Sequence, residues 1–285
     1  MPATKINLSQ SSNEALFSLL QDRDESIASL AMEQILLSSD FEKQMQNYQD
    51  SPEGQVRKRV HQMGNIANRR RILEHFLASV EKNELDTWQG MMLIDRLYDP
   101  QSSFNYLKQM TNELIREFNP RRGVTAALAH FMKERNFLVP SQNWFDVSNF
   151  LLGDVLESRI GAAGLLCILA KHIGTFRNWQ GNICLHAGRF CLFDENHSLI
   201  DPSEEWTIRK KTKTDQFHIC KPKEILLLVL SQLFCLSVIN WAPWDIHLFS
   251  RILVALQHLD VEQLPYPLGN YLNPERKYPE ISLPF

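Results

Sequence analysis

The sequence predicts an α+β fold that is mostly α-helical, with a small antiparallel sheet, a helical N-terminal half and a helical pair near the C-terminus. Apolar residues recur at helical spacing from Asn13 to about Glu134, which indicates successive amphipathic helices. Strand-like segments are confined to residues 180–200, between turns rich in Gly, Asp and Asn. Two apolar helical segments follow, Pro222 to Ile239 and Trp244 to Leu259.

Composition and charge narrow the class of protein. The 285 residues are 44% hydrophobic and 22% charged, which is ordinary for a globular chain. A net charge of −3 gives no general attraction to nucleic acid or to an anionic membrane. The first residues lack the apolar segment of a signal peptide, and the longest apolar run, Ile225 to Ile239, is shorter than the roughly 20 residues of a spanning helix. We therefore expect a cytoplasmic protein with no membrane or nucleic-acid partner.

The cysteines have no regular spacing and are odd in number. No CxxC or Cys/His pattern indicates zinc, so the sequence predicts no metal site and no cofactor. Buried, reduced thiols are the simplest interpretation. The cysteines are Cys167, Cys184, Cys191, Cys220 and Cys235.

Residues 1–82 are predicted to form a helical N-terminal region. Two helices flank an Asp22-Arg-Asp24 turn and resemble one HEAT-type hairpin, with no second copy that would make a solenoid. The apolar residues expected to line the hairpin are Leu16, Leu19, Leu20, Ile27, Leu30, Ala31 and Ile35. A helix from Ser51-Pro52 to about Glu81 follows. Its basic residues, 57–59 and 69–71, spread over more than one face without interleaved aromatics, which favours a solvated surface.

Residues 83–220 are predicted to form the core, with helices first and the sheet after them. The expected helices are Leu85–Tyr98, Ser103–Phe118 and Val124–Arg135, and the expected strands are Gln180–Leu185, Arg189–Phe193 and Ser198–Ile200.

The C-terminal part is predicted to comprise the helical pair at residues 221–260 and an extended, Pro-rich tail at 261–285. Five tryptophans cluster in the second half of the chain, Trp144, Trp179, Trp206, Trp241 and Trp244. We expect them to pack in the core or between helices. An exposed peptide-binding aromatic edge is the alternative.

The segment from Asp146 to Pro202 contains a series of short motifs, which begins with Asp146-x-x-Asn149 and continues with Arg159-x-Gly161. This order resembles the SirB-type branch of the transglutaminase-like superfamily, in which an Asp-x-x-Asn precedes a helix and an Arg-x-Gly follows it. A very apolar run, 162–170, lies where the family has a buried helix. Further along, Gly188-Arg189-Phe190 lies at the family's Gly-His-Phe, and Asp201-Pro202 at its Asp-Pro. The resemblance implies a transglutaminase-like, papain-like core at 83–220.

Departures from the family pattern indicate that the active site is degenerate. The position of the nucleophilic Cys, usually Ser in the SirB-type branch, falls on Leu165. The position of the His falls on Arg189, and only the acid Asp201 remains. A Leu side chain cannot attack a carbonyl, and an Arg stays protonated and cannot act as a general base. We therefore expect these three positions to be vestigial, Arg189 to pair with Asp201 and no residue to be catalytic.

Another thiol could in principle replace the missing nucleophile. Cys167 lies two residues beyond Leu165, which turns the helix by about 200° and directs its sulfur away from the groove. His186 lies three residues before Arg189, which would place it on the opposite face of a continuous strand. A Cys167/His186/Asp201 triad therefore needs two register shifts. The alignment between Gly174 and Gly188 stays open, because this chain has about four extra residues there.

The sequence therefore predicts a catalytically inactive, transglutaminase-like protein that acts as a binding or regulatory module for a protein or peptide. One alternative is an active thiol protease or acyl transferase that uses Cys167 with His186. The other is a helical adaptor that binds its partner through the N-terminal helices. The residues expected to line the groove are Asp146, Asn149, Cys167, His186, Arg189 and Asp201.

Overall fold

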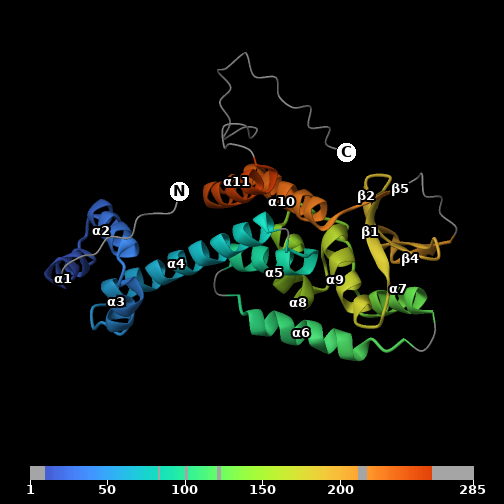
Figure 1. The fold of residues 1–285 in the computed structure, drawn as a ribbon, viewed down its shortest axis with the longest axis horizontal. Helices are drawn as coiled ribbons and strands as arrows, with labels where there is room; N and C mark the ends of the chain where they lie inside the picture. Colours follow the sequence, from blue (N-terminus) through green and yellow to red (C-terminus); the bar gives the residue numbers. More distant parts are fainter. Residues whose placement is uncertain (1–9, 83, 100–101, 121–122, 211–216, 259–285) are drawn as a thin grey trace, which may run out of the picture. The chain divides into compact units, whose positions relative to one another are not determined.

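The computed structural model describes residues 10–82, 84–99, 102–120, 123–210 and 217–258 (Figure 1). It is mostly helical with a small antiparallel sheet, so the predicted fold class is confirmed. The chain forms two compact units, Met1–Ile72 and Leu73–Phe285, whose boundary falls inside helix α4 (Gly54–Glu81). The tail predicted at 261–285 lies outside the described residues.

The first unit contains the expected helical hairpin, formed by α1 (Gln10–Leu19) and α2 (Glu25–Leu37). Asp24 caps α2 by accepting a hydrogen bond from the Ser26 N–H. Arg59 of α4 is 3% exposed and donates to the carbonyls of Leu20 and Asp22 in the inter-helix turn. Because a buried guanidinium needs acceptors, this turn and Arg59 stabilise each other. α3 (Phe41–Tyr48) and the part of α4 up to Ile72 complete the unit.

The buried face of α2 differs from the one expected. Ile27 and Leu30 are 39% and 63% exposed, whereas Ala28, Ala31 and Ile35 are buried. The buried residues follow the i, i+3, i+7 spacing, so the packed stripe is rotated toward the smaller side chains. The two large apolar residues are therefore left on the surface.

The second unit surrounds α9 (Ala163–Thr175), which is the central apolar helix that the sequence predicts. Nine of its residues are buried, and it packs against α5, α6, α7, α10 and the strands β1 and β2. Figure 1 shows α9 beside the sheet. The other described helices of this unit are α5 (Thr87–Tyr98), α6 (Phe104–Glu117), α7 (Val124–Glu134), η1 (Val147–Phe150), α8 (Leu152–Ser158), η2 (Pro202–Glu204), α10 (Pro222–Ile239) and α11 (Pro243–Gln257).

The sheet has five antiparallel strands in the order β4-β3-β2-β1-β5. Three were expected, namely β1 (Gly181–His186), β2 (Arg189–Asp194) and β3 (Leu199–Asp201). β4 (Thr207–Arg209) and β5 (Phe217–Ile219) were not. Each is only three residues long and has no fully buried side chain, so neither gives a run long enough for a strand to be recognised from sequence.

The β1–β2 hairpin corrects the expected position of His186. Ala187 and Gly188, both with positive φ, form a two-residue turn, and His186 pairs directly with Arg189. Residues that are directly opposite in an antiparallel pair lie on the same face of the sheet. The prediction of opposite faces was wrong because it treated the two residues as members of one continuous strand.

Among the described residues, α10 alone is long and apolar enough to cross a membrane by length and composition. It packs against α5, α9 and α11, and eight of its residues are buried. An interior helix of a soluble domain has the same character, so this feature does not identify a membrane protein.

Candidate functional site

A cavity of about 550 Å³ lies where the N-terminal turn of α9, the β1–β2 turn and the C-terminal half of α10 meet. This volume is in the range of small-molecule and peptide side-chain sites. The lining is mostly apolar and includes Trp144, Phe145, Gly164, Phe190 and Ile239. Arg189 also lines the cavity and contributes a charged group.

Asp146 and Asn149 hold the η1 segment in place, and Asn149 also contacts the residue before α9. The Asp146 carboxylate caps η1 by accepting from the Ser148 N–H at 3.0 Å. The Asn149 side chain donates to the Asn143 carbonyl at 3.0 Å, and the main-chain carbonyl of Asn149 accepts from the Ala162 N–H at 2.8 Å. Of the two, only Asn149 lines the cavity. The Asp-x-x-Asn pattern therefore has a structural role here.

The Arg159-x-Gly161 pattern also has a backbone explanation. Arg159 ends α8 in the left-handed conformation, with φ 66°, and its guanidinium lies 4.7 Å from the ring centroid of Phe137. A Cβ on Gly161 would approach Val155 methyl carbons to 2.8 Å, so only glycine fits. Leu138 pairs with this segment through hydrogen bonds to the Arg159 carbonyl and from the Gly161 N–H.

Leu165 is the third residue of α9 and is fully buried. The preceding turn, not Leu165 itself, faces the cavity, since α9 contributes Ala163 and Gly164 to the lining. Gly164 packs directly against Phe190, whose ring carbon would lie 2.9 Å from an added Cβ. The N-terminal end of α9 thus meets the sheet through an apolar contact.

Arg189 and Asp201 form the predicted pair, with Nη2 3.5 Å from Oδ2. The Asp201 side chain is 1% exposed, whereas that of Arg189 is 40% exposed. Arg189 also contacts Glu204 at 3.1 Å, and Glu204 in turn pairs with Arg209. The Arg189 charge is therefore compensated by two carboxylates, which disfavours a role for Arg189 in binding a free anion.

The buried thiols of the domain are not activated. Burial holds the pKa of Cys167 well above its usual value of 9.0 and raises that of Cys184 to about 12. Cys167 is fully buried and does not line the cavity. His186 and Asp201 do not line the cavity either, although the strand pairing places both on the same face of the sheet as Arg189. The candidate triad of Cys167, His186 and Asp201 therefore does not converge on this cavity.

Cys235 of α10 is the one exposed cysteine, and it lines the cavity. Its partial burial raises its pKa, which favours the thiol over the thiolate. The described lining residues include no His. A nucleophile needs an adjacent base or a lowered pKa, so this thiol lacks both forms of activation. The prediction that all five thiols are buried was therefore wrong for Cys235, because the apolar run around it suggests an interior helix on every face.

The tryptophans divide into two groups. Trp179 and Trp206 are buried as expected, and their indole N–H groups donate to Thr125 and to the Phe137 carbonyl. The prediction of core packing was wrong for the others: Trp144, Trp241 and Trp244 are 70%, 62% and 81% exposed. Trp144 lines the cavity, whereas Trp241 and Trp244 do not.

Comparison with protein families matches residues 101–218 to the transglutaminase-like superfamily. The matched range contains Asp146, Asn149, Leu165, Arg189 and Asp201. No curated protein and no solved structure matches the chain significantly.

Proposed function

From the premise that residues 101–218 are a transglutaminase-like domain, we propose that the cavity between this domain and α10 binds an apolar segment of a protein partner and that the protein does not catalyse acyl transfer. One observation carries the proposal. The cavity at the start of α9 is lined by apolar side chains and a charge-compensated Arg189, and its described lining pairs no thiol with an imidazole. Within the superfamily, we assign the chain to the SirB-type branch as a divergent member.

The chemistry of the substituted positions supports the loss of catalysis. Thiol acyl transfer needs a nucleophile and a base that removes its proton. Leu165 supplies only carbon and hydrogen, and the Arg189 guanidinium only donates hydrogen bonds. Asp201 is held by Arg189 and by the Ser203 N–H, so it has no imidazole to orient.

The rim of the cavity supports an apolar peptide as the ligand. Trp144, Phe145 and Ile239 are each at least 60% exposed and all three line the cavity. Exposed aromatic and aliphatic side chains around a preformed apolar pocket are typical of the anchoring points of protein interfaces. The N–H groups of Arg189 that do not contact Asp201 or Glu204 could donate hydrogen bonds to the main-chain carbonyl oxygens of an extended peptide.

Selection of peptides from a random display library on the full-length protein tests this proposal. We expect Trp144→Ala to weaken a selected peptide at least about tenfold, or ~1.4 kcal/mol, by fluorescence anisotropy. Trp244→Ala is the matched control, because Trp244 is more exposed but does not line the cavity. Selected peptides that bind equally to wild type and Trp144→Ala would contradict the assignment of the site.

The absence of thiol catalysis is tested in a Cys235→Ser background, which removes the exposed thiol. Among the five cysteines, the other four are buried, so a native Cys235→Ser protein should resist an active-site-directed electrophile. Stoichiometric labelling of Cys167 that disappears in the His186→Ala variant would instead establish the thiol enzyme alternative.

The N-terminal helical adaptor is a second candidate function, favoured by the surface of α2. Ile27 and Leu30 are exposed and three residues apart, so they lie on one face of that helix. The same display experiment separates the two candidates. Loss of peptide binding in Leu30→Asp, with full binding in Trp144→Ala, would assign recognition to the N-terminal helices.

A further inference from the structure

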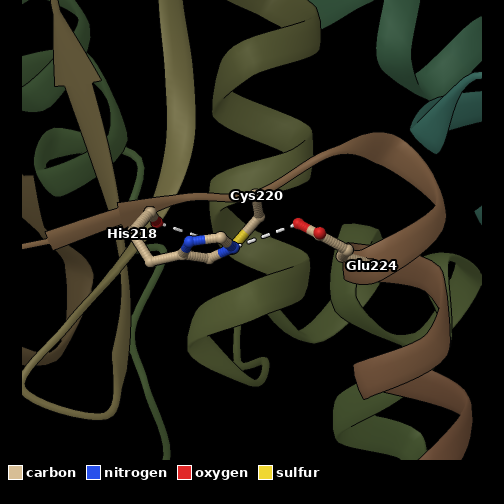
Figure 2. A group of neighbouring side chains, drawn as sticks. All are labelled: His218, Cys220 and Glu224. Carbon is tan, nitrogen blue, oxygen red and sulfur yellow. Dashed lines mark hydrogen bonds and ion pairs between the residues drawn. The ribbon is translucent and has the colours of Figure 1, made fainter.

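Three potential metal ligands gather between β5 and the start of α10, outside the cavity described above. The donor atoms of His218, Cys220 and Glu224 all lie within 4.8 Å of one another (Figure 2). The sequence predicts no metal site, because the spacing His-x-Cys-x₃-Glu matches none of the usual Cys/His patterns. We propose that these three residues bind a zinc ion.

The backbone holds the three residues in place. His218 belongs to β5, and the Cys220 N–H donates to the Ile183 carbonyl of β1 at 3.0 Å. Glu224 lies in the first turn of α10, where its carboxylate accepts from the Lys221 N–H at 2.8 Å. This capping bond orients the carboxylate as an outer-shell partner orients a metal ligand.

The distance between the nitrogen and oxygen donors fits a tetrahedral zinc site, and the sulfur lies close enough to complete it. Nε2 of His218 lies 3.2 Å from Oε2 of Glu224. Nitrogen and oxygen ligands about 2.0–2.1 Å from zinc are about 3.3 Å apart at a tetrahedral angle. A sulfur ligand about 2.3 Å from the ion would lie about 3.5 Å from each. The Cys220 sulfur lies within 4.8 Å of the nitrogen and oxygen donors, so it would have to move closer to them by no more than roughly 1.3 Å when the ion binds.

The arrangement suits a metal better than a catalytic triad. In a triad, the acid and the nucleophile contact opposite nitrogens of the imidazole. Here Glu224 contacts Nε2, and in Figure 2 the Cys220 sulfur lies toward the same end of the ring. The three donors therefore lie toward one end of the imidazole, which is the side from which an ion could contact all of them.

The donor types favour zinc over the hard cations. A thiolate and an imidazole bind zinc well, whereas calcium and magnesium prefer sets of oxygen ligands. On binding, the Cys220 thiol would release its proton to solvent and the imidazole would coordinate in its neutral form. His218 and Glu224 are 64% and 42% exposed, so a fourth position would be open to water or to another ligand.

Titration of the metal-free, full-length protein with Co²⁺ tests the site, because tetrahedral cobalt bound to a thiolate has visible d–d bands and a near-ultraviolet charge-transfer band. We expect both bands to saturate at one equivalent of Co²⁺ and to be displaced by Zn²⁺. Cys220→Ser should lose the charge-transfer band, and His218→Ala should weaken binding at least tenfold. His218 is exposed, so its replacement should leave the far-ultraviolet circular dichroism unchanged.

Cys235→Ser is the matched control, because it removes the exposed thiol of α10 and leaves the cluster intact. The proposal is overturned if wild type shows no saturable cobalt spectrum at micromolar concentrations. It is also overturned if the spectrum persists in His218→Ala and is lost in Cys235→Ser, since the exposed thiol would then be the ligand.

Discussion

Replacement of Arg189 by Ala measures how much the pair with Asp201 stabilises the domain. Removing one partner of a fully buried ion pair costs about 3–5 kcal/mol, because a charge is left buried without a partner. In this protein the Arg189 side chain is 40% exposed, so water screens the interaction. The Asp201 carboxylate also keeps its hydrogen bond from the Ser203 N–H. We therefore expect a smaller loss, about 1–2 kcal/mol.

Urea unfolding followed by tryptophan fluorescence is the appropriate assay. All six tryptophans lie in the unit Leu73–Phe285, so the signal reports on the domain that contains the pair. With an m value of roughly 2–3 kcal/mol/M, the expected loss lowers the unfolding midpoint by about 0.5 M. Glu204→Gln, at the more exposed partner, should lower it by less than about 0.2 M.

Two results would refute the reasoning. An Arg189→Ala midpoint within about 0.1 M of wild type would mean that the pair contributes nothing in solution. A decrease of more than about 1.5 M would mean that Arg189 is buried and that solvent screening was assigned wrongly.

Three further predictions concern other parts of the molecule. Burial lowers the pKa of His172 from 6.5 to about 4. As the pH falls, His172 therefore binds a proton in the unfolded chain before it does so in the folded protein, and the free energy of unfolding should fall by at most about 3 kcal/mol between pH 6.5 and pH 4. This acid-side loss should diminish in His172→Phe, as measured by urea midpoints at pH 7 and pH 4.5. Gly164→Ala should destabilise the domain by about 1 kcal/mol, because the steric cost of placing the new Cβ against Phe190 exceeds the gain in helix propensity. An unchanged urea midpoint would contradict that contact. Arg59→Ala should cost the N-terminal unit about 2–3 kcal/mol, measured as a lower urea midpoint by circular dichroism, and an unchanged midpoint would contradict the contacts between Arg59 and the inter-helix turn.

The parts of the fold that sequence reasoning predicted well are those with a strong, regular pattern. The continuous apolar run of α9 predicts a helix surrounded by protein, and Leu165 within it is fully buried. The bounds of α10 were predicted because Pro222 starts it and Asn240 ends its apolar run. The Arg189–Asp201 pair was predicted from the family pattern, which places the two positions together.

The parts that were missed depend on contacts between distant residues. Trp206 is buried and Trp144 is exposed, although the residue type is the same. The difference depends on whether another element of the fold covers the side chain. The neighbourhood of His186 depends on a two-residue turn that reverses the chain. Cys235 lines the cavity only because α10 passes beside the start of α9. Local periodicity carries no information about such coverage.

The alkylation rate of Cys235, measured against pH with and without a selected peptide, tests the central claim most directly. Cys235 lines the cavity, and its raised pKa predicts slow reaction at neutral pH that accelerates only in alkaline solution. A peptide bound in the cavity should cover the thiol and slow the reaction further. Rapid alkylation at neutral pH would instead indicate an activated thiolate, and an unchanged rate with saturating peptide would place binding elsewhere; either result would contradict an apolar, non-catalytic binding site at the start of α9.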